Sequence, residues 1–178
     1  MFMHIDTKKT AVGGILMALA VLCIVLGGIL EFNTLFLLAA ASFFVGVMIR
    51  EGGLAAGLAF YAGTAALGLL LAPQKLYCVT FAAMGGYILG AEGLFRLAGR
   101  RGKGRQMFWW TGKFIVFNLL YLPALFIFPR LIFADGIQGI WRWIGVAVGQ
   151  ILFLIYDRAY EYFLTVLWEG FRGRLGLK

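Results

Sequence analysis

Ionisable side chains inside long apolar stretches are the residues of this sequence that could do chemistry. Lys113, Asp157 and Glu92 each lie within, or at the end of, a run of mostly apolar residues. A charge inside a bilayer is costly unless it is paired, so such residues face a bundle interior or a water-filled cavity. We predict that Lys113 and Asp157 reach similar depth on antiparallel helices and form an ion pair, with Glu92 as a third member. This ion pair would either clamp the helix ends together or belong to a functional site.

Two amides and a set of polar and aromatic residues are the candidates for contacting a ligand. Asn118 and Gln150 lie closer to the middle of their apolar stretches, where an interhelical hydrogen bond or a ligand contact would satisfy them. Glu31, Trp141 and Arg142 lie near short connections on the opposite side from most basic residues. They would form either an interfacial belt or the roof of a small-molecule pocket.

The inventory for catalysis is small. The single histidine, His4, lies in the N-terminal tail, and the two cysteines, Cys23 and Cys78, are far apart in apolar segments. Met3-His4-Ile5 is similar to the start of cobalt- and nickel-binding membrane subunits, but Met1-Phe2 precede it and there is no second histidine. We therefore expect neither an enzyme nor a bound metal or cofactor.

The composition indicates a membrane protein. Hydrophobic residues make up 62% of the chain and charged residues 13%, and the mean hydropathy is +0.91. A soluble domain of this size could not bury so much apolar surface, so lipid must cover part of it. The net charge of +8 is explained by contact with an anionic inner leaflet, and we expect no nucleic-acid partner.

Apolar runs of about 20 residues, bounded by charge, Pro or polar turns, predict about six spans. Because the connections are short, neighbouring helices must be antiparallel. We predict an all-α, polytopic transmembrane bundle that forms a single domain over residues 1–178. The predicted spans are 10–30, 34–49, 52–72, 76–98, 107–128 and 137–156.

The distribution of Lys and Arg predicts an orientation in the cell membrane with both termini in the cytoplasm. On this topology, 13 of the 16 basic residues lie on the cytoplasmic side. Three, namely Lys75, Arg130 and Arg142, lie outside.

The C-terminal stretch has two interpretations. Apolar residues recur with helical spacing from Tyr160 to Phe171, opposite Arg158, Glu161 and Glu169. This pattern predicts an amphipathic helix near 158–172 that lies in the membrane interface. Alternatively, the sixth span starts near Ile144 and carries Asp157, Arg158 and Glu161 in its inner half.

The chain resembles the substrate-binding S components of energy-coupling factor (ECF) transporters. The resemblance rests on overall size, on six predicted spans, on the opening Lys8-Lys9-Thr10-Ala11-Val12-Gly13-Gly14-Ile15-Leu16-Met17-Ala18-Leu19-Ala20, and on the closing Gly149-Gln150-Ile151-Leu152-Phe153-Leu154-Ile155-Tyr156-Asp157. In that family an Ala-x-x-x-Ala face on the first helix docks the shared transmembrane coupling subunit. The matching positions here are Gly14 and Ala18.

The resemblance implies a subunit that captures a vitamin-like small molecule outside the cell. A coupling subunit and two ATPases would then drive its release inward. Two other classes stay open, namely a structural or assembly subunit that binds only proteins, and a membrane-embedded enzyme. A cavity open to the outer face would favour transport, and a fully packed bundle would favour assembly.

Overall fold

The chain folds as a bundle of helices. The computed structural model describes residues 7–30, 33–97, 105–127 and 140–175, and this part of the chain contains no strand. In chain order the long helices are α1 (Thr7–Ile29), α2 (Thr34–Leu71), α3 (Lys75–Leu97), α4 (Arg105–Ile127) and α6 (Ile140–Tyr162). A six-residue π-helix, η2 (Phe163–Trp168), and α7 (Glu169–Leu175) continue α6 without a gap.

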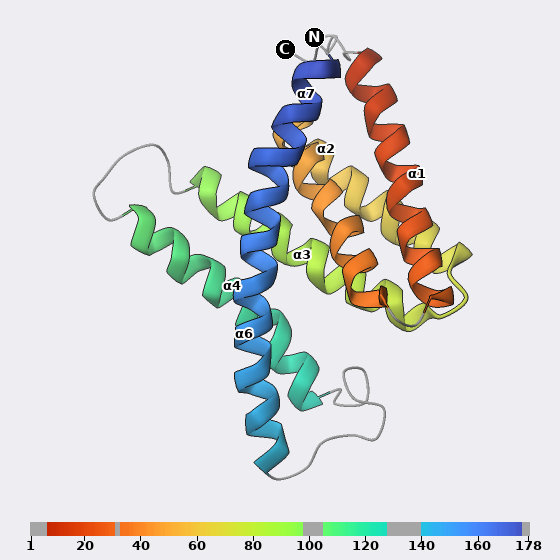
Figure 1. Cartoon of the computed structure of the whole chain (residues 1–178). Helices are drawn as coiled ribbons and strands as arrows, with labels where there is room; N and C mark the ends of the chain where they lie inside the picture. The colour runs from red at the N-terminus through yellow and green to blue at the C-terminus, as the bar shows by residue number, and fades with distance from the viewer. Residues whose placement is uncertain (1–6, 31–32, 98–104, 128–139, 176–178) are drawn as a thin grey trace.

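Helix α2 is broken in the middle. Gly53 has φ 88° and ψ 174°, a conformation that is open almost only to glycine. The break separates two arms, 34–52 and 54–71, that run in opposite directions (Figure 1). The arms pack tightly near the break, since a Cβ at Gly57 would lie 2.1 Å from the side chain of Ile49. The sequence placed this break at Arg50 and Glu51, but both residues are helical, and Gly53, the second of the two glycines that follow them, supplies the turn.

Three described helices are long and apolar enough to cross a membrane, namely Thr7–Ile29, Thr34–Leu71 and Lys75–Arg96. A straight helix of 23 residues, the length of α1, spans about 34 Å, which exceeds a hydrocarbon core of about 30 Å. The two arms of α2 span about 28 Å and about 27 Å. Helices α4 and α6 are also 23 residues long, but they carry more polar residues than α1.

The C-terminal helix, by which we mean α6, η2 and α7 together, has no break between Asp157 and Arg158. It therefore differs from a span ending at 156 that is followed by a separate interfacial helix. It extends from the far end of the α4–α6 pair, past the α2 break, to the end of the molecule where α1 begins (Figure 1). The start of α1, the α2 break and α7 all lie at the same end of the molecule.

The core lies between α1, α2 and α3, and the second half of the C-terminal helix closes it. Ile24, Leu38 and Phe81 are fully buried there. Close approach of the C-terminal helix depends on Gly46, where a Cβ would lie 2.1 Å from the Tyr160 hydroxyl oxygen.

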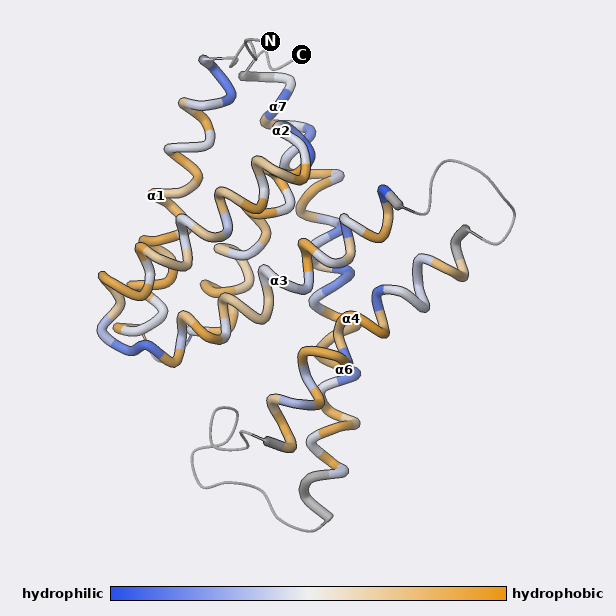
Figure 2. Tube along the Cα trace, turned by 180° about the vertical axis from the view of Figure 1, so that it is seen from behind, coloured by the Kyte–Doolittle hydropathy of each residue, from blue (hydrophilic) through white to orange (hydrophobic). Residues whose placement is uncertain are grey.

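The outer surface is largely apolar. Phe36, Leu70 and Leu119 are 73%, 78% and 71% exposed. Hydrophilic residues gather at the start of α1, at α7 and at the α2–α3 turn, while the stretches between are mostly hydrophobic (Figure 2). A surface of this kind fits a lipid environment.

Candidate functional site

A buried ion pair joins α4 to α6. The Lys113 ammonium lies 2.7 Å from Asp157 Oδ1 and donates a 2.8 Å hydrogen bond to Oδ2. Asp157 is 0% exposed and Lys113 is 1% exposed, so the lysine does not extend to the surface. This is the contact expected from the similar depth of the two residues on antiparallel helices.

Glu161, and not Glu92, is the second carboxylate of this site. Lys113 Nζ lies 2.8 Å from Glu161 Oε1, because Glu161 follows Asp157 by four residues and shares its helix face. Glu92 instead accepts a 2.9 Å hydrogen bond from Tyr160 and lies 3.9 Å from Arg50. The predicted participation of Glu92 is therefore wrong, since Glu92 faces the α2 break.

Aromatic residues complete the surroundings of the ion pair. Tyr87, on α3, donates a 2.7 Å hydrogen bond to Asp157 Oδ1. The Trp109 ring lies under the Lys113 ammonium, 3.7 Å from the ring centroid to Nζ, which is a favourable cation–π distance. We call Tyr87, Trp109, Lys113, Asp157 and Glu161 the Lys113 cluster; it joins α3, α4 and α6.

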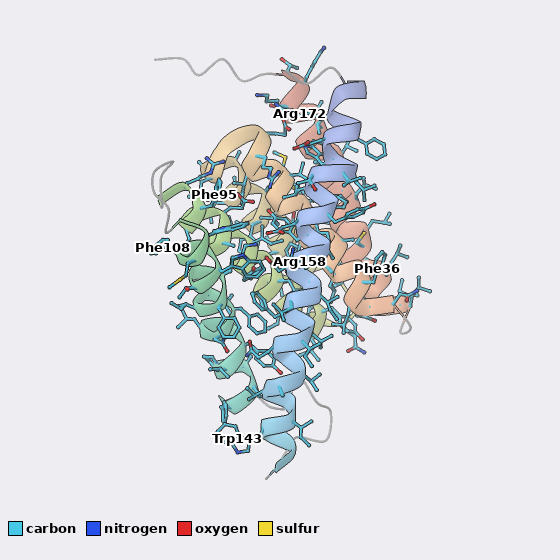
Figure 3. All side chains as sticks on the ribbon, turned by 60° about the vertical axis from the view of Figure 1, so that its left-hand side comes forward. Phe36, Phe95, Phe108, Trp143, Arg158 and Arg172 are labelled. Atoms are coloured by element: carbon cyan, nitrogen blue, oxygen red, sulfur yellow. The ribbon has the colours of Figure 1, made fainter. Side chains whose placement is uncertain are left out.

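The same face of the C-terminal helix carries further polar contacts to α2. Tyr156 shares a 2.7 Å hydrogen bond with Ser42. At the end of η2, Trp168 Nε1 donates to Glu51 Oε1 at 3.0 Å. Arg172 lies 3.2 Å from the same oxygen, near the end of the helix (Figure 3). The bundle-facing side of this helix therefore makes hydrogen bonds to α2 and α3 in addition to apolar contacts.

Charged residues also surround the α2 break. The carbonyl oxygen of Ile49, near the end of the first arm, accepts a 2.6 Å hydrogen bond from Arg96. This bond satisfies one of the carbonyl groups that the end of a helix leaves without an intrahelical partner. The side chain of Glu51 is 5% exposed, and its Oε2 has no hydrogen-bond partner among the described residues.

The two candidate amides contact each other. Gln150 Nε2 donates a 2.9 Å hydrogen bond to Asn118 Oδ1, and Asn118 Nδ2 donates to the Phe114 carbonyl. Gln150 Oε1 is buried and has no partner within the described chain. The interhelical hydrogen bond is thus present, and one buried acceptor has no partner among the described residues.

The residues predicted near the outer side do not have described side chains, so the structure gives no contact between them and the Asn118–Gln150 pair. Glu31 and His4 lie outside the described residues, as do the side chains of Trp141 and Arg142, whose backbone is in the first turn of α6. Trp143, the next residue, is 69% exposed and lies near the end of α6 that is remote from α7 (Figure 3).

The proposed docking residues lie on the outward face of α1. Gly14 and Ala18 are both exposed, and a Cβ at Gly14 would meet nothing within 4 Å. Gly13, one residue earlier, faces inward, where a Cβ would lie 3.0 Å from Met48. A second helix could therefore approach α1 closely at Gly14 and Ala18.

Sequence reasoning did not place Tyr87, Trp109 or Glu161 in a site. The four-residue spacing of Asp157 and Glu161 was a usable signal for Glu161. Tyr87 and Trp109 carried no such signal, because their positions depend on how α3 and α4 are rotated about their axes.

The described residues contain no group of three His, Cys, Asp or Glu side chains able to hold a metal ion. Comparison of the chain with protein-family models, curated proteins and solved structures finds no match.

Proposed function

We propose that this protein is the membrane-embedded, substrate-binding subunit of an uptake transporter for a vitamin-like small molecule, of the ECF S-component type. Separate ATPase subunits would power it through a transmembrane coupling subunit. The observation that carries the proposal is the exposed small-residue face of α1 at Gly14 and Ala18. The chain itself would hydrolyse nothing.

The proposal includes six membrane crossings with both termini in the cytoplasm. Successive helices, with α2 counted as two arms, run in alternating directions (Figure 1). Described basic residues at the end shared by the α2 break and α7 include Arg50, Arg96 and Arg172, whereas Lys75 begins α3 at the other end. This asymmetry supports the assignment of the Arg-rich end to the cytoplasm.

Polar groups between the helices support a binding role. Gln150 Oε1 is a buried acceptor without a partner, and Asn118 lies beside it. With Glu31, Trp141 and Arg142 near the outer side, they are the residues that we propose contact the substrate.

Affinity purification of the tagged protein from its native membrane, with mass spectrometry of what accompanies it, tests the proposal. A coupling subunit and ATPases should accompany the wild type and be lost from Gly14→Leu and Ala18→Leu. Gly93→Leu is the matched control, since Gly93 also has nothing within 4 Å of an added Cβ but lies on α3. Equal recovery of transporter subunits from all variants would contradict docking at Gly14 and Ala18. Recovery of no transporter subunit with the wild type would contradict the transport role.

An assembly subunit of a membrane complex is the second candidate. The observation that favours it is the internal pairing of the polar groups, since Lys113 pairs with Asp157 and Gln150 with Asn118. Such pairs hold helices together without any ligand. Co-purification with a complex that contains no ATPase would support this role.

A further inference from the structure

The spacing of the inward-facing residues changes along the C-terminal helix. In α6 these residues follow one another after four and then three positions, which suits an α-helix of 3.6 residues per turn. From Tyr160 onward they recur at every fourth position, through η2 and into α7. The inward-facing residues are Phe153, Asp157, Tyr160, Leu164, Trp168 and Arg172.

An unbroken α-helix could not keep all of these side chains on one face. An α-helix turns by about 100° per residue, so Arg172, twelve positions after Tyr160, would be rotated about 120° away from it. The six residues of η2 form wider turns, of about 4.4 residues, and so turn back by roughly 110° in total. The π-helix is therefore what keeps Trp168 and Arg172 on Glu51.

Few contacts hold η2 in this geometry. A π-helix is rare because the α-helix is the more stable arrangement of the same backbone, so it persists where surrounding contacts favour it. At the far end of η2, Trp168 Nε1 lies 3.0 Å from Glu51 Oε1, and Arg172 Nε lies 3.2 Å from the same oxygen. The other oxygen, Glu51 Oε2, is buried and has no hydrogen-bond partner among the described residues. A single carboxylate oxygen thus receives both contacts.

We propose that η2 is a conformational switch that latches α7 onto Glu51 and can release it. The latched state is the one in this structure. In the released state residues 163–168 wind as an α-helix, α7 turns by about 110° about its axis, and Trp168 and Arg172 leave Glu51. Release uncovers a carboxylate at the α2 break and frees a guanidinium near the end of the molecule where α1 begins (Figure 1). Any molecule that binds either charged group stabilises the released state. The switch does not rest on the uptake function.

Distances between two nitroxide labels, measured by electron paramagnetic resonance, test the switch. The full chain is purified in detergent with Cys23 and Cys78 replaced by Ala. One label is attached at Ile15→Cys, on α1, where the side chain is 62% exposed. The other is attached at Gly173→Cys, on α7, where an added Cβ meets nothing within 4 Å.

Loss of the latch should move α7 as a unit. The labelled chain with Glu51 should give one main distance. Glu51→Ala should give a second, equally narrow distance that differs by up to about 9 Å, because α7 turns and stays helical. Glu169→Ala, which removes an exposed carboxylate of α7, is the control and should keep the first distance.

Deletion of Val166 separates the register of the helix from its contacts. Val166 is 51% exposed and lies within η2, so its deletion removes no buried side chain. Arg172 then follows Tyr160 by eleven positions, which an α-helix covers within about 20° of three full turns. The deletion should keep the first distance, and should keep it also in combination with Glu51→Ala, because no π-helix is left to rewind.

Three outcomes would overturn the proposal. One is the same single distance with and without Glu51→Ala, since loss of the latch would then not release α7. Another is a broad distribution of distances in Glu51→Ala, because α7 would then unravel and not turn. The third is a shifted distance after deletion of Val166, because η2 would then not set the register. If the deletion variant does not fold, Glu51→Ala and Glu169→Ala decide. Co-purification of transporter subunits does not depend on any of these outcomes.

Discussion

At the scale of the residue, Lys113 supplies the positive charge that makes two carboxylates tolerable inside the bundle. Asp157 has no exposed surface, so in the absence of Lys113 only the Tyr87 hydroxyl would stabilise its charge. The cost of an uncompensated buried charge exceeds the net value of the ion pair itself. The three ionised groups therefore depend on one another.

Replacement of Lys113 by Met should lower the free energy of unfolding by about 3 kcal/mol, because it leaves Asp157 without a cation. Asp157→Asn should cost less, since Lys113 keeps Glu161 at 2.8 Å. Reversible unfolding in mixed detergent measures both variants. Arg158→Met, at an exposed position, is the control and should change stability by less than about 1 kcal/mol. Equal losses in all three variants would contradict the ion-pair argument.

Gly46 provides a second test at this scale. A Cβ there would lie 2.1 Å from the Tyr160 hydroxyl oxygen, so Gly46→Ala must displace the buried Tyr160 ring, which also donates a hydrogen bond to Glu92. We expect a loss of about 1–3 kcal/mol in the same assay. Gly14→Ala, where an added Cβ meets nothing within 4 Å, should be neutral or slightly stabilising because alanine favours the helix. If Gly46→Ala matches Gly14→Ala, the close approach of the C-terminal helix at Gly46 is wrong.

The Lys113–Asp157 contact could be predicted because it depends only on depth along two antiparallel helices. Hydrophobic boundaries give that depth. The choice of Glu161 over Glu92 depends on which way each helix faces. In α3 and α4 large apolar residues lie on the exposed side as well as on the buried side, so hydrophobicity says little about which side faces the bundle.

At the scale of the element, the α2 break shows how one glycine turns a 38-residue helix into two arms. The first arm ends with Arg96 bonded to the Ile49 carbonyl, so the break is held from α3 as well as by its own backbone. The sequence indicated two apolar runs here, because the charged pair Arg50-Glu51 separates them. It did not indicate that both charged residues belong to the first arm, since that depends on where φ becomes positive.

Gly53→Ala should destabilise the protein by about 1–3 kcal/mol, because φ 88° with ψ 174° is strained for any residue with a Cβ. Its effect should appear as a lower unfolding temperature. Gly170→Ala is the comparison, since Gly170 lies in helical α7 with free space around it, and alanine there should stabilise by up to about 1 kcal/mol. A stabilising Gly53→Ala would mean that the helix continues through this position.

The C-terminal helix buries Asp157 together with Tyr160, Leu164 and Trp168, whereas its exposed residues include the charged Arg158 and Glu169 as well as apolar ones. Ile155, Tyr162 and Phe171 are 61%, 60% and 57% exposed, while Asp157 and Trp168 face inward. The sequence showed the amphipathic pattern, but the same pattern fits a helix lying on a membrane. The partners of Asp157 and Trp168, on α2, α3 and α4, decide between the two, and they lie more than 40 positions away in the chain.

At the scale of the whole molecule, the number of membrane crossings depends on α4 and α6. Helices α1, α2 and α3 are apolar enough to span a membrane by themselves, whereas α4 and α6 carry the Lys113 cluster and the Asn118–Gln150 pair. Buried pairing lowers the cost of placing such residues in lipid, because the charges and amides satisfy each other. We therefore predict that α4 and α6 also cross.

Cysteine labelling distinguishes the two topologies. In a background in which Cys23 and Cys78 are replaced by Ala, single cysteines at Glu31, Lys103 and Asp135 are treated with an impermeant maleimide on intact cells. Six crossings with cytoplasmic termini predict labelling of Glu31→Cys and Asp135→Cys, and of Lys103→Cys only after permeabilisation. If α4 and α6 do not cross, Asp135→Cys behaves like Lys103→Cys. Labelling of Lys103→Cys alone on intact cells would reverse the orientation, because the basic connection between α3 and α4 would then lie outside.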